Sequence, residues 1–355
     1  MSAPSESASA LREVVDFDVL GAWMDAQGLP RGCFERIEPL TGGTQNILIR
    51  FSRADRDYVL RRPPLHLRPK SNEALRREAR VLAALATTDV PHPALIAACL
   101  DEQVMGGAVF YLMEPVAGFN ATTALPALHA SDERIRHAMG LHAADAVACL
   151  GRIDYVAAGL GDLGRPQGFL ERQVERWLSE LGSYARFAGY PGPNIPGVDA
   201  VARWIDDNRP RTWTPGILHG DYHLANLMYA YDGPEVVAIV DWEMCTIGDP
   251  LLDLGWLLAT WPDAEAGFLG PSAALAVAGG LPTRDEIAAR YAEGSSRNLS
   301  AIAWYTVLAC FKLGIVLEGT HARAHAGLAA RATGDLLHAW TLALFRRAAA
   351  IIAAS

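Results

Sequence analysis

Short apolar runs separated by turn residues fill the first part of the chain. The turn residues are Thr41-Gly42-Gly43-Thr44 and Ala54-Asp55. Runs of this length bounded by such turns are typical of strands that follow one another in an antiparallel sheet. The pattern therefore predicts three strands, at residues 34–40, 46–51 and 58–61.

The pattern changes after Pro63-Pro64, where a helix is predicted over 71–86. Leu75 and Leu82 lie seven residues apart within it, as on one face of a helix. A further strand, 108–113, ends at Glu114-Pro115, and turn residues of this kind suit a connector between two lobes. We expect an N-terminal lobe over 17–114, with a hinge near 111–118.

The rest of the chain, 115–355, shows mostly helical periodicity. Amphipathic helices are predicted near residues 131–150, 168–184, 197–208, 284–293, 299–319 and 327–352. One polar, strand-containing segment, 216–246, interrupts them. The expected fold is therefore α+β with two lobes: a small antiparallel sheet with one main helix, followed by a mostly helical C-terminal lobe.

Composition narrows the class of protein. The 355 residues carry a net charge of −9 and 20% are charged, whereas a nucleic-acid binder usually needs a basic face. The cysteines form no CxxC pair, so neither a disulfide framework nor a zinc ribbon is indicated. We expect a cytoplasmic enzyme without a nucleic-acid partner.

The chain ends and the apolar stretches bear on targeting. Residues 1–16 lack the basic and apolar regions of a signal peptide, so we expect a disordered leader. Charges such as Asp335 and Arg346 interrupt the C-terminal apolar stretch, and a bilayer span needs about 20 apolar residues. No membrane contact is expected, and the sequence leaves the oligomeric state open.

The segment that carries candidate chemistry runs from His219-Gly220-Asp221 to Asn226, followed by a strand and Asp241. Phosphoryl transfer needs a carboxylate for the proton of the attacking hydroxyl and oxygen ligands for Mg²⁺. Asp221 and Asn226 are spaced as the base and the metal-binding Asn of the kinase catalytic loop, and Asp241 follows a strand as the second metal ligand does.

These residues resemble the aminoglycoside phosphotransferase (choline-kinase-like) branch of the protein-kinase-like superfamily. Gly248-Asp249-Pro250 and Asp253 downstream fit it too. The resemblance implies Asp221 as the catalytic base and Asp253 as a structural carboxylate that braces the loop. It also implies Mg²⁺ held by Asn226 and Asp241, with ATP or GTP as phosphoryl donor.

In the small lobe the resemblance implies nucleotide contacts at Gly42, Gly43, Thr44, Arg61, Glu78, Tyr111 and Met113. The glycines would let backbone N–H groups approach phosphate. Tyr111 and Met113 fall where the family's hinge contacts the base through backbone groups. Arg61, paired with Glu78, stands where the family has lysine; arginine keeps the charge but is bulkier.

The acceptor is expected to be a hydroxyl group of a small molecule, since no Arg precedes Asp221 and no Phe-Gly follows Asp241. The stretches 58–64 and 77–82 look closest to the kinase-like domains fused to acyl-CoA dehydrogenases, which implies a hydroxyacyl thioester. An aminoglycoside, a polycation, would suit an acidic pocket, and the net charge leans weakly towards it.

Two other classes of function remain open. Arg61 in place of lysine would suit a catalytically silent nucleotide-binding regulatory protein. His219, Asp221 and His223, two residues apart, would share one face of a strand and form a zinc-hydrolase site, although Asn226 and Asp241 would then have no role. His321 and His325, at i and i+4, have no evident third ligand and are not assigned a metal.

Overall fold

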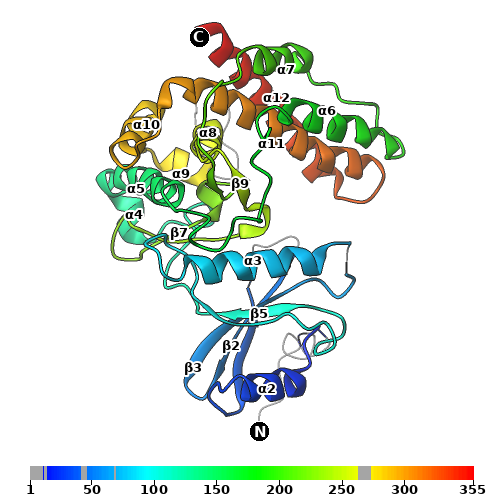
Figure 1. Cartoon of the computed structure of the whole chain (residues 1–355), viewed down its shortest axis with the longest axis vertical. Helices are drawn as coiled ribbons and strands as arrows, with labels where there is room; N and C mark the ends of the chain where they lie inside the picture. The colour runs from blue at the N-terminus through cyan, green and yellow to red at the C-terminus, as the bar shows by residue number, and fades with distance from the viewer. Residues whose placement is uncertain (1–10, 12–13, 41–45, 68, 263–272) are drawn as a thin grey trace. The chain divides into compact units, whose positions relative to one another are not determined.

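The computed structural model describes residues 11, 14–40, 46–67, 69–262 and 273–355 (Figure 1). The described chain divides into two compact units. The N-terminal unit comprises Met1–Ala117 with Val240–Glu243, and the C-terminal unit comprises Gly118–Ile239 with Met244–Ser355. The segment that contains Asp241 thus groups with the N-terminal unit, although the chain on both sides of it belongs to the other.

A five-stranded antiparallel sheet forms the centre of the N-terminal unit. Its strand order is β1 (Phe34–Pro39), β2 (Ile47–Arg53), β3 (Arg56–Arg62), β5 (Phe110–Met113), β4 (Leu95–Cys99). Ala54 and Asp55 both have positive φ, 51° and 60°, which is the geometry of a two-residue hairpin turn. The three consecutive strands predicted from the sequence are confirmed; β4 was missed.

Two helices accompany this sheet. The helix α2 (Phe17–Ala26) begins at Asp16, whose side chain accepts hydrogen bonds from Asp18 N and Val19 N. The second helix, α3 (Ser71–Leu85), corresponds to the one predicted over 71–86. It buries Leu75, Leu82 and Leu85 together with Glu78. Helix α3 therefore carries one charged side chain on its buried face.

The hydrophobic core of the N-terminal unit includes residues expected to lie in a leader. Leu11 and Val15 are 8% and 1% exposed and pack with Leu20, Phe51 and Phe110. The expected disordered leader over 1–16 is therefore wrong for Leu11 and Val15, whose apolar side chains join the core. Residues 1–10 and 12–13 lie outside the described residues.

The C-terminal unit is mostly helical, as expected. Its helices are α4 (Ala127–Ser131), α5 (Glu133–Gly151), α6 (Gln173–Ser183), η1 (Tyr184–Arg186), α7 (Val198–Asp207), α8 (Leu251–Thr260), α9 (Ala273–Ala278), α10 (Arg284–Glu293), η5 (Leu299–Ala301), α11 (Ile302–His325) and α12 (Arg331–Ala354). The helix α8 was missed, because all but its last residue are buried and it shows no polar face.

Two small sheets hold the polar segment that was predicted to interrupt the helices. One pairs β6 (Gly216–Leu218) with β9 (Thr246–Gly248), and the other pairs β7 (Leu227–Tyr229) with β8 (Val236–Ile239). Two single 3-10 turns, η2 (Leu224–Asn226) and η3 (Trp242–Met244), precede β7 and follow β8. The loop after β6 is thereby fixed at both ends.

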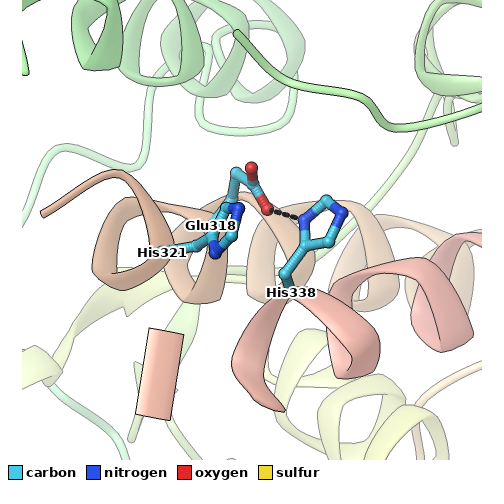
Figure 2. A group of neighbouring side chains, drawn as sticks. All are labelled: Glu318, His321 and His338. Atoms are coloured by element: carbon cyan, nitrogen blue, oxygen red, sulfur yellow. Dashed lines mark hydrogen bonds and ion pairs between the residues drawn. The ribbon is translucent and has the colours of Figure 1, made fainter. Parts of the chain in front are cut away.

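The long helices α11 and α12 pack against each other. Glu318 of α11 and His338 of α12 meet across this contact, with Oε2 and Nδ1 2.7 Å apart (Figure 2). By length and composition alone both helices could cross a bilayer, but 61% of the apolar window of α11 is buried inside the protein, as in a core helix. The absence of membrane contact stays a prediction.

Candidate active site

The loop between β6 and η2 carries the first predicted site residues. Gly220 has φ +87°, and a Cβ there would lie 2.5 Å from the carbonyl oxygen of Met244. Only glycine satisfies both conditions without strain. The loop therefore turns sharply just before Asp221 and lies close against the chain that leads into β9.

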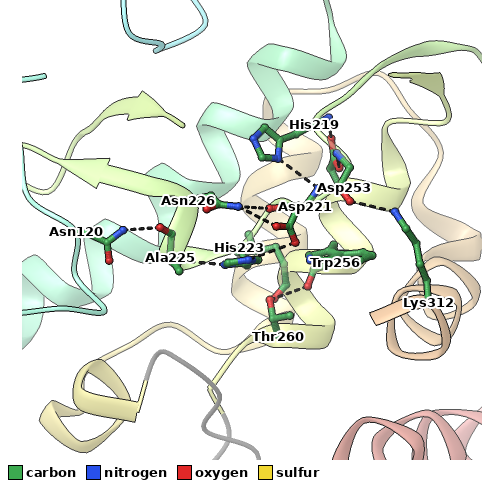
Figure 3. Close-up of polar contacts among 12 residues, drawn as sticks. Asn120, His219, Asp221, His223, Ala225, Asn226, Asp253, Trp256, Thr260 and Lys312 are labelled. Atoms are coloured by element: carbon green, nitrogen blue, oxygen red, sulfur yellow. Dashed lines mark hydrogen bonds and ion pairs between the residues drawn. The ribbon is translucent and has the colours of Figure 1, made fainter. Parts of the chain in front are cut away.

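Asp253, in the first turn of α8, braces this loop (Figure 3). Its carboxylate accepts the backbone N–H of His219 at 2.6 Å and that of Gly220 at 2.9 Å. Burial raises the pKa of Asp253 to about 7, and the two backbone N–H groups oppose that rise. The bracing contact that the resemblance implied is confirmed.

Lys312 of α11 also supports the loop and was not singled out as a site residue in the sequence. Its Nζ donates to the carbonyl oxygen of Gly220 at 3.1 Å and lies 4.4 Å from the centre of the Trp256 ring. Burial lowers the pKa of Lys312 to about 8, while Asp221 and Asp253 raise it. A sequence signal existed: Lys312 is one of two lysines and interrupts an apolar helix.

Asp221 faces a histidine whose tautomer the structure defines. The Nδ1 atom of His223 accepts the backbone N–H of Ala225 at 3.2 Å, so the ring proton resides on Nε2, 3.3 Å from Asp221 Oδ1. Burial would raise the pKa of Asp221, but His223, His219 and Lys312 outweigh it and hold that pKa well below its usual range. Asp221 is therefore an ionised hydrogen-bond acceptor at neutral pH.

Asn226 lies against Asp221. Its Nδ2 donates to the backbone oxygen of Asp221 at 2.9 Å and to Asp221 Oδ2 at 3.1 Å. Asn120 fixes the same turn by donating to the carbonyl oxygen of Ala225 at 2.5 Å. With its nitrogen used in this way, Asn226 presents the carbonyl oxygen Oδ1, an atom type that Mg²⁺ prefers.

The alternative zinc site at His219, Asp221 and His223 is not formed. The segment is a turn rather than a strand, so alternate residues do not share a face, and the Nδ1 atom of His219 accepts the backbone N–H of Asp221. Within the described part of the chain, three metal-binding side chains converge only at Glu318, His321 and His338.

In the N-terminal unit, one guanidinium joins two predicted site residues. Arg61 Nη2 donates to Glu78 Oε1 at 2.9 Å and to Asp241 Oδ1 at 2.8 Å. Burial alone would lower the pKa of Arg61, but Glu78, Tyr111 and Asp241 outweigh burial and raise that pKa above its usual value. Burial raises the pKa of Glu78, although Arg61 opposes that shift. The predicted pairing of Arg61 with Glu78 is present, and Asp241 joins it.

Asp241 adopts a backbone conformation that is uncommon for its residue type. Its φ is +68°, and non-glycine residues in this region often lie at functional sites, where the surroundings enforce the strain. Its side chain is 36% exposed, against 1% for Glu78. Asp241 is thus the accessible carboxylate of the pair that Arg61 joins.

The other residues predicted to contact a nucleotide differ in their positions. Tyr111 lies inside the sheet, opposite Arg61 of β3 and Ala98 of β4, and its hydroxyl lies 3.4 Å from Glu78 Oε2. Its side chain therefore braces Glu78, and the expected contact of its backbone with a base stays a prediction. Met113 ends β5 and is 9% exposed. Gly42, Gly43 and Thr44 lie outside the described residues.

Comparison with known families identifies the chain. Residues 36–299 match the family model APH, described as a phosphotransferase enzyme family. The chain belongs to the APH phosphotransferase family. The match includes the loop from His219 to Asn226, Asp241 and Asp253, so the site residues lie within the part of the chain that defines the family.

The curated relatives are larger proteins. Acyl-CoA dehydrogenase family member 10 of Mus musculus is 29% identical over 288 residues, which cover 79% of this chain and 26% of the relative. Acyl-CoA dehydrogenase family member 11 of Homo sapiens is 28% identical over 304 residues, 83% of this chain and 37% of the relative. The chain spans between about a quarter and somewhat more than a third of the length of these relatives. The resemblance to kinase-like domains of acyl-CoA dehydrogenase proteins is confirmed.

Solved structures show the fold. A candidate aminoglycoside phosphotransferase of Ralstonia eutropha has a TM-score of 0.76 and 30% identity, over 95% of this chain and 99% of that one. The macrolide 2′-phosphotransferase MphH of Brachybacterium faecium has a TM-score of 0.57 and 19% identity, over 92% and 97%. The APH phosphotransferase therefore has the expected protein-kinase-like α+β fold.

Proposed function

We propose that this APH phosphotransferase is a small-molecule kinase that transfers the γ-phosphoryl group of ATP to a hydroxyl group, with Mg²⁺ as cofactor. The observation that carries the proposal is the pairing of an ionised Asp221 with Asn226, 3.1 Å from Oδ2 to Nδ2, on a loop braced by Asp253. A carboxylate base beside an amide metal ligand is what phosphoryl transfer requires.

Asp221 acts on the acceptor. In the proposed step the acceptor oxygen forms a bond to the γ-phosphorus while the bond from that phosphorus to the β–γ bridging oxygen breaks and ADP leaves. The hydroxyl proton passes to a carboxylate oxygen of Asp221. Because the pKa of Asp221 is low, its main contribution is to hold and orient the hydroxyl until the bond to phosphorus has begun to form.

Asn226 and Asp241 are the residues that fit the cation. Both offer oxygen ligands. The amide nitrogen of Asn226 is hydrogen-bonded to Asp221, which leaves its amide oxygen for the cation, and the carboxylate of Asp241 is partly exposed. Asn226 directly precedes β7, Asp241 follows β8 by two residues, and Leu227 pairs with Ile239. When bound, Mg²⁺ neutralises charge on the phosphates.

Arg61 takes the role of the family's lysine. Its guanidinium, anchored by Glu78 at 2.9 Å, also contacts Asp241 at 2.8 Å. In the proposed complex Arg61 keeps Glu78 and exchanges Asp241 for phosphate oxygens, which releases Asp241 for the cation. Arginine can contact a carboxylate and a phosphate together because its donors form a rigid fork.

The phosphoryl donor is proposed to be ATP. An aminoglycoside phosphotransferase in the APH(4)-Ia group, with a TM-score of 0.54 and 13% identity, was solved with ADP and hygromycin B. That likeness concerns the fold. The family assignment supports a nucleotide of the same kind here, and no comparison supports GTP.

The acceptor is proposed from two classes, aminoglycosides and hydroxyacyl thioesters. The relatives named as acyl-CoA dehydrogenase family members favour the second class. A screen that couples ADP release to aminoglycosides, sugars, choline-like alcohols and hydroxyacyl thioesters tests the proposal. The expected result is acceptor-dependent ADP release for one class. Nucleotide binding without turnover for any acceptor would favour the silent regulatory protein instead.

A further inference from the structure

A cluster of metal-binding side chains, two of them buried, lies where α11 meets α12, separate from the catalytic loop. Glu318 and His321 are three residues apart on α11 and so project from one face of that helix, and His338 comes from α12 (Figure 2). One ligand atom from each residue lies within 4.8 Å of the other two. The rings of His321 and His338 are stacked, with centroids 4.5 Å apart.

The cluster has an unsatisfied nitrogen. His321 is 8% exposed, and its Nδ1 is buried without a hydrogen-bond partner among the described residues; Asp335 Oδ1 lies 3.5 Å away, beyond normal hydrogen-bond geometry. A buried polar atom without a partner is unfavourable and calls for an explanation, such as a bound ion. His321 is one of the three residues whose ligand atoms converge.

Further side chains hold the cluster in position. Glu318 is fully buried, and Tyr190 donates to its Oε1 at 2.7 Å, which leaves Oε2 to face His338. His325, one turn beyond His321, lies 3.3 Å from it between Nε2 atoms. Metal ligands are commonly fixed by hydrogen bonds of this kind from neighbouring groups.

Charge also suits a cation. The carboxylate of Glu318 supplies a negative charge that a divalent cation would neutralise.

We propose that Glu318, His321 and His338 bind one divalent transition-metal ion, with zinc as the best fit. Two histidines and one glutamate are a known zinc ligand set, in which bonds of about 2.0–2.2 Å place ligand atoms roughly 3.4 Å apart. The present separations, up to 4.8 Å, need only small side-chain rotations to reach this. Two imidazoles disfavour Mg²⁺ and Ca²⁺.

The metal would fasten three parts of the C-terminal unit. It would join α11 to α12 directly, and through the hydrogen bond from Tyr190 to Glu318 it would anchor the segment between η1 and α7. The fourth position remains for water. The competing explanation is a hydrogen-bonded buried cluster without a metal, in which His338 and Glu318 simply pair.

The test is zinc binding by the full chain after treatment with a chelator, without nucleotide. Calorimetric titration is expected to show one zinc per chain, and zinc should raise the melting temperature. Co²⁺ should give the d–d absorption bands of a tetrahedral site, a measurement that needs no variant. Binding only at millimolar zinc, or octahedral Co²⁺ bands, would overturn the proposal.

Variants locate the site. His338→Gln and His321→Asn should each weaken zinc binding at least tenfold and abolish the rise in melting temperature. His137→Gln is the matched control, because His137 makes a similar contact to Glu286 at 3.2 Å, on an exposed face. Unchanged affinity in both His338→Gln and His321→Asn, or equal loss in the control, would contradict the proposal.

Discussion

The two units hold their site carboxylates in different ways. In the N-terminal unit, Glu78 and Asp241 share one nitrogen of Arg61, at 2.9 and 2.8 Å. In the C-terminal unit, Asp221 faces a histidine at 3.3 Å, and backbone hydrogen bonds to Asp253 hold its loop. The first arrangement neutralises charge, and in the proposed mechanism Arg61 must exchange Asp241 for phosphate to bind a nucleotide. The second keeps an ionised acceptor in a fixed position.

The largest expected effect comes from removing the charge of the fixed acceptor. Asp221→Asn keeps the shape and the contact to Asn226 but cannot accept a proton, so turnover should fall by roughly 10³-fold, within the range for general base catalysis. Nucleotide affinity, measured by calorimetry, should stay within about threefold of wild type. Turnover close to wild type would show that Asp221 is not the base.

Removing the guanidinium of Arg61, which Glu78 and Asp241 share, tests the arrangement in the N-terminal unit. Arg61→Met leaves Glu78 buried without its partner, and we expect turnover to fall by about 10²-fold, with a higher KM for ATP, as for loss of a charged phosphate contact. Arg61→Lys is the matched variant and should recover part of the rate. Equal activity of Arg61→Met and wild type would mean that Arg61 has no role with phosphate.

Many of the site residues and elements could be predicted from the sequence, because their signals lie in short stretches of the chain. Asp221, Asn226 and Asp241 stand out because their spacing along the chain is itself the signal. The three strands of the small sheet follow from apolar runs between turn residues. The helix α2 was not predicted, although it had a readable signal, an Asp16 cap followed by Phe17 and Leu20 at helical spacing.

Other features depend on packing that no local pattern reveals. The strand β4 has mostly half-buried small and apolar residues without alternation, and α8 is buried nearly all round. The contact of Lys312 with Gly220 joins residues far apart along the chain. The contact of His338 with Glu318 joins two helices. Their pairing depends on how helices are aligned in space. The buried position of Tyr111 depends likewise on the order of the strands.

A smaller effect is expected from the lysine that donates a hydrogen bond to the loop. Lys312→Met removes the hydrogen bond to Gly220 and the charge beside Asp221 and Asp253, so kcat should fall by about tenfold, the usual scale for a charged hydrogen bond. KM for ATP should change little, because Lys312 contacts the backbone of the loop and none of the residues proposed to bind the nucleotide. Lys70→Met, at the only other lysine and exposed, is the control. An equal loss in both variants would exclude a positioning role for Lys312.

The smallest expected effect is a shift in pH dependence. His223 lowers the pKa of Asp221, so His223→Gln should raise that pKa and move the acidic limb of the kcat profile upward by about one pH unit. At a given acidic pH more Asp221 is then protonated and inactive, whereas activity at alkaline pH should be preserved. A limb that stays in place, or moves to lower pH, would contradict the proposed contact.

The most direct test of the central claim is detection of the product by ³¹P NMR, with ATP, Mg²⁺ and the acceptor found by screening. The account predicts a new phosphomonoester signal on the acceptor, formed in step with ADP by the wild-type chain and absent with Asp221→Asn under the same conditions. Free phosphate as the only product, or an equal phosphomonoester signal from Asp221→Asn, would contradict it.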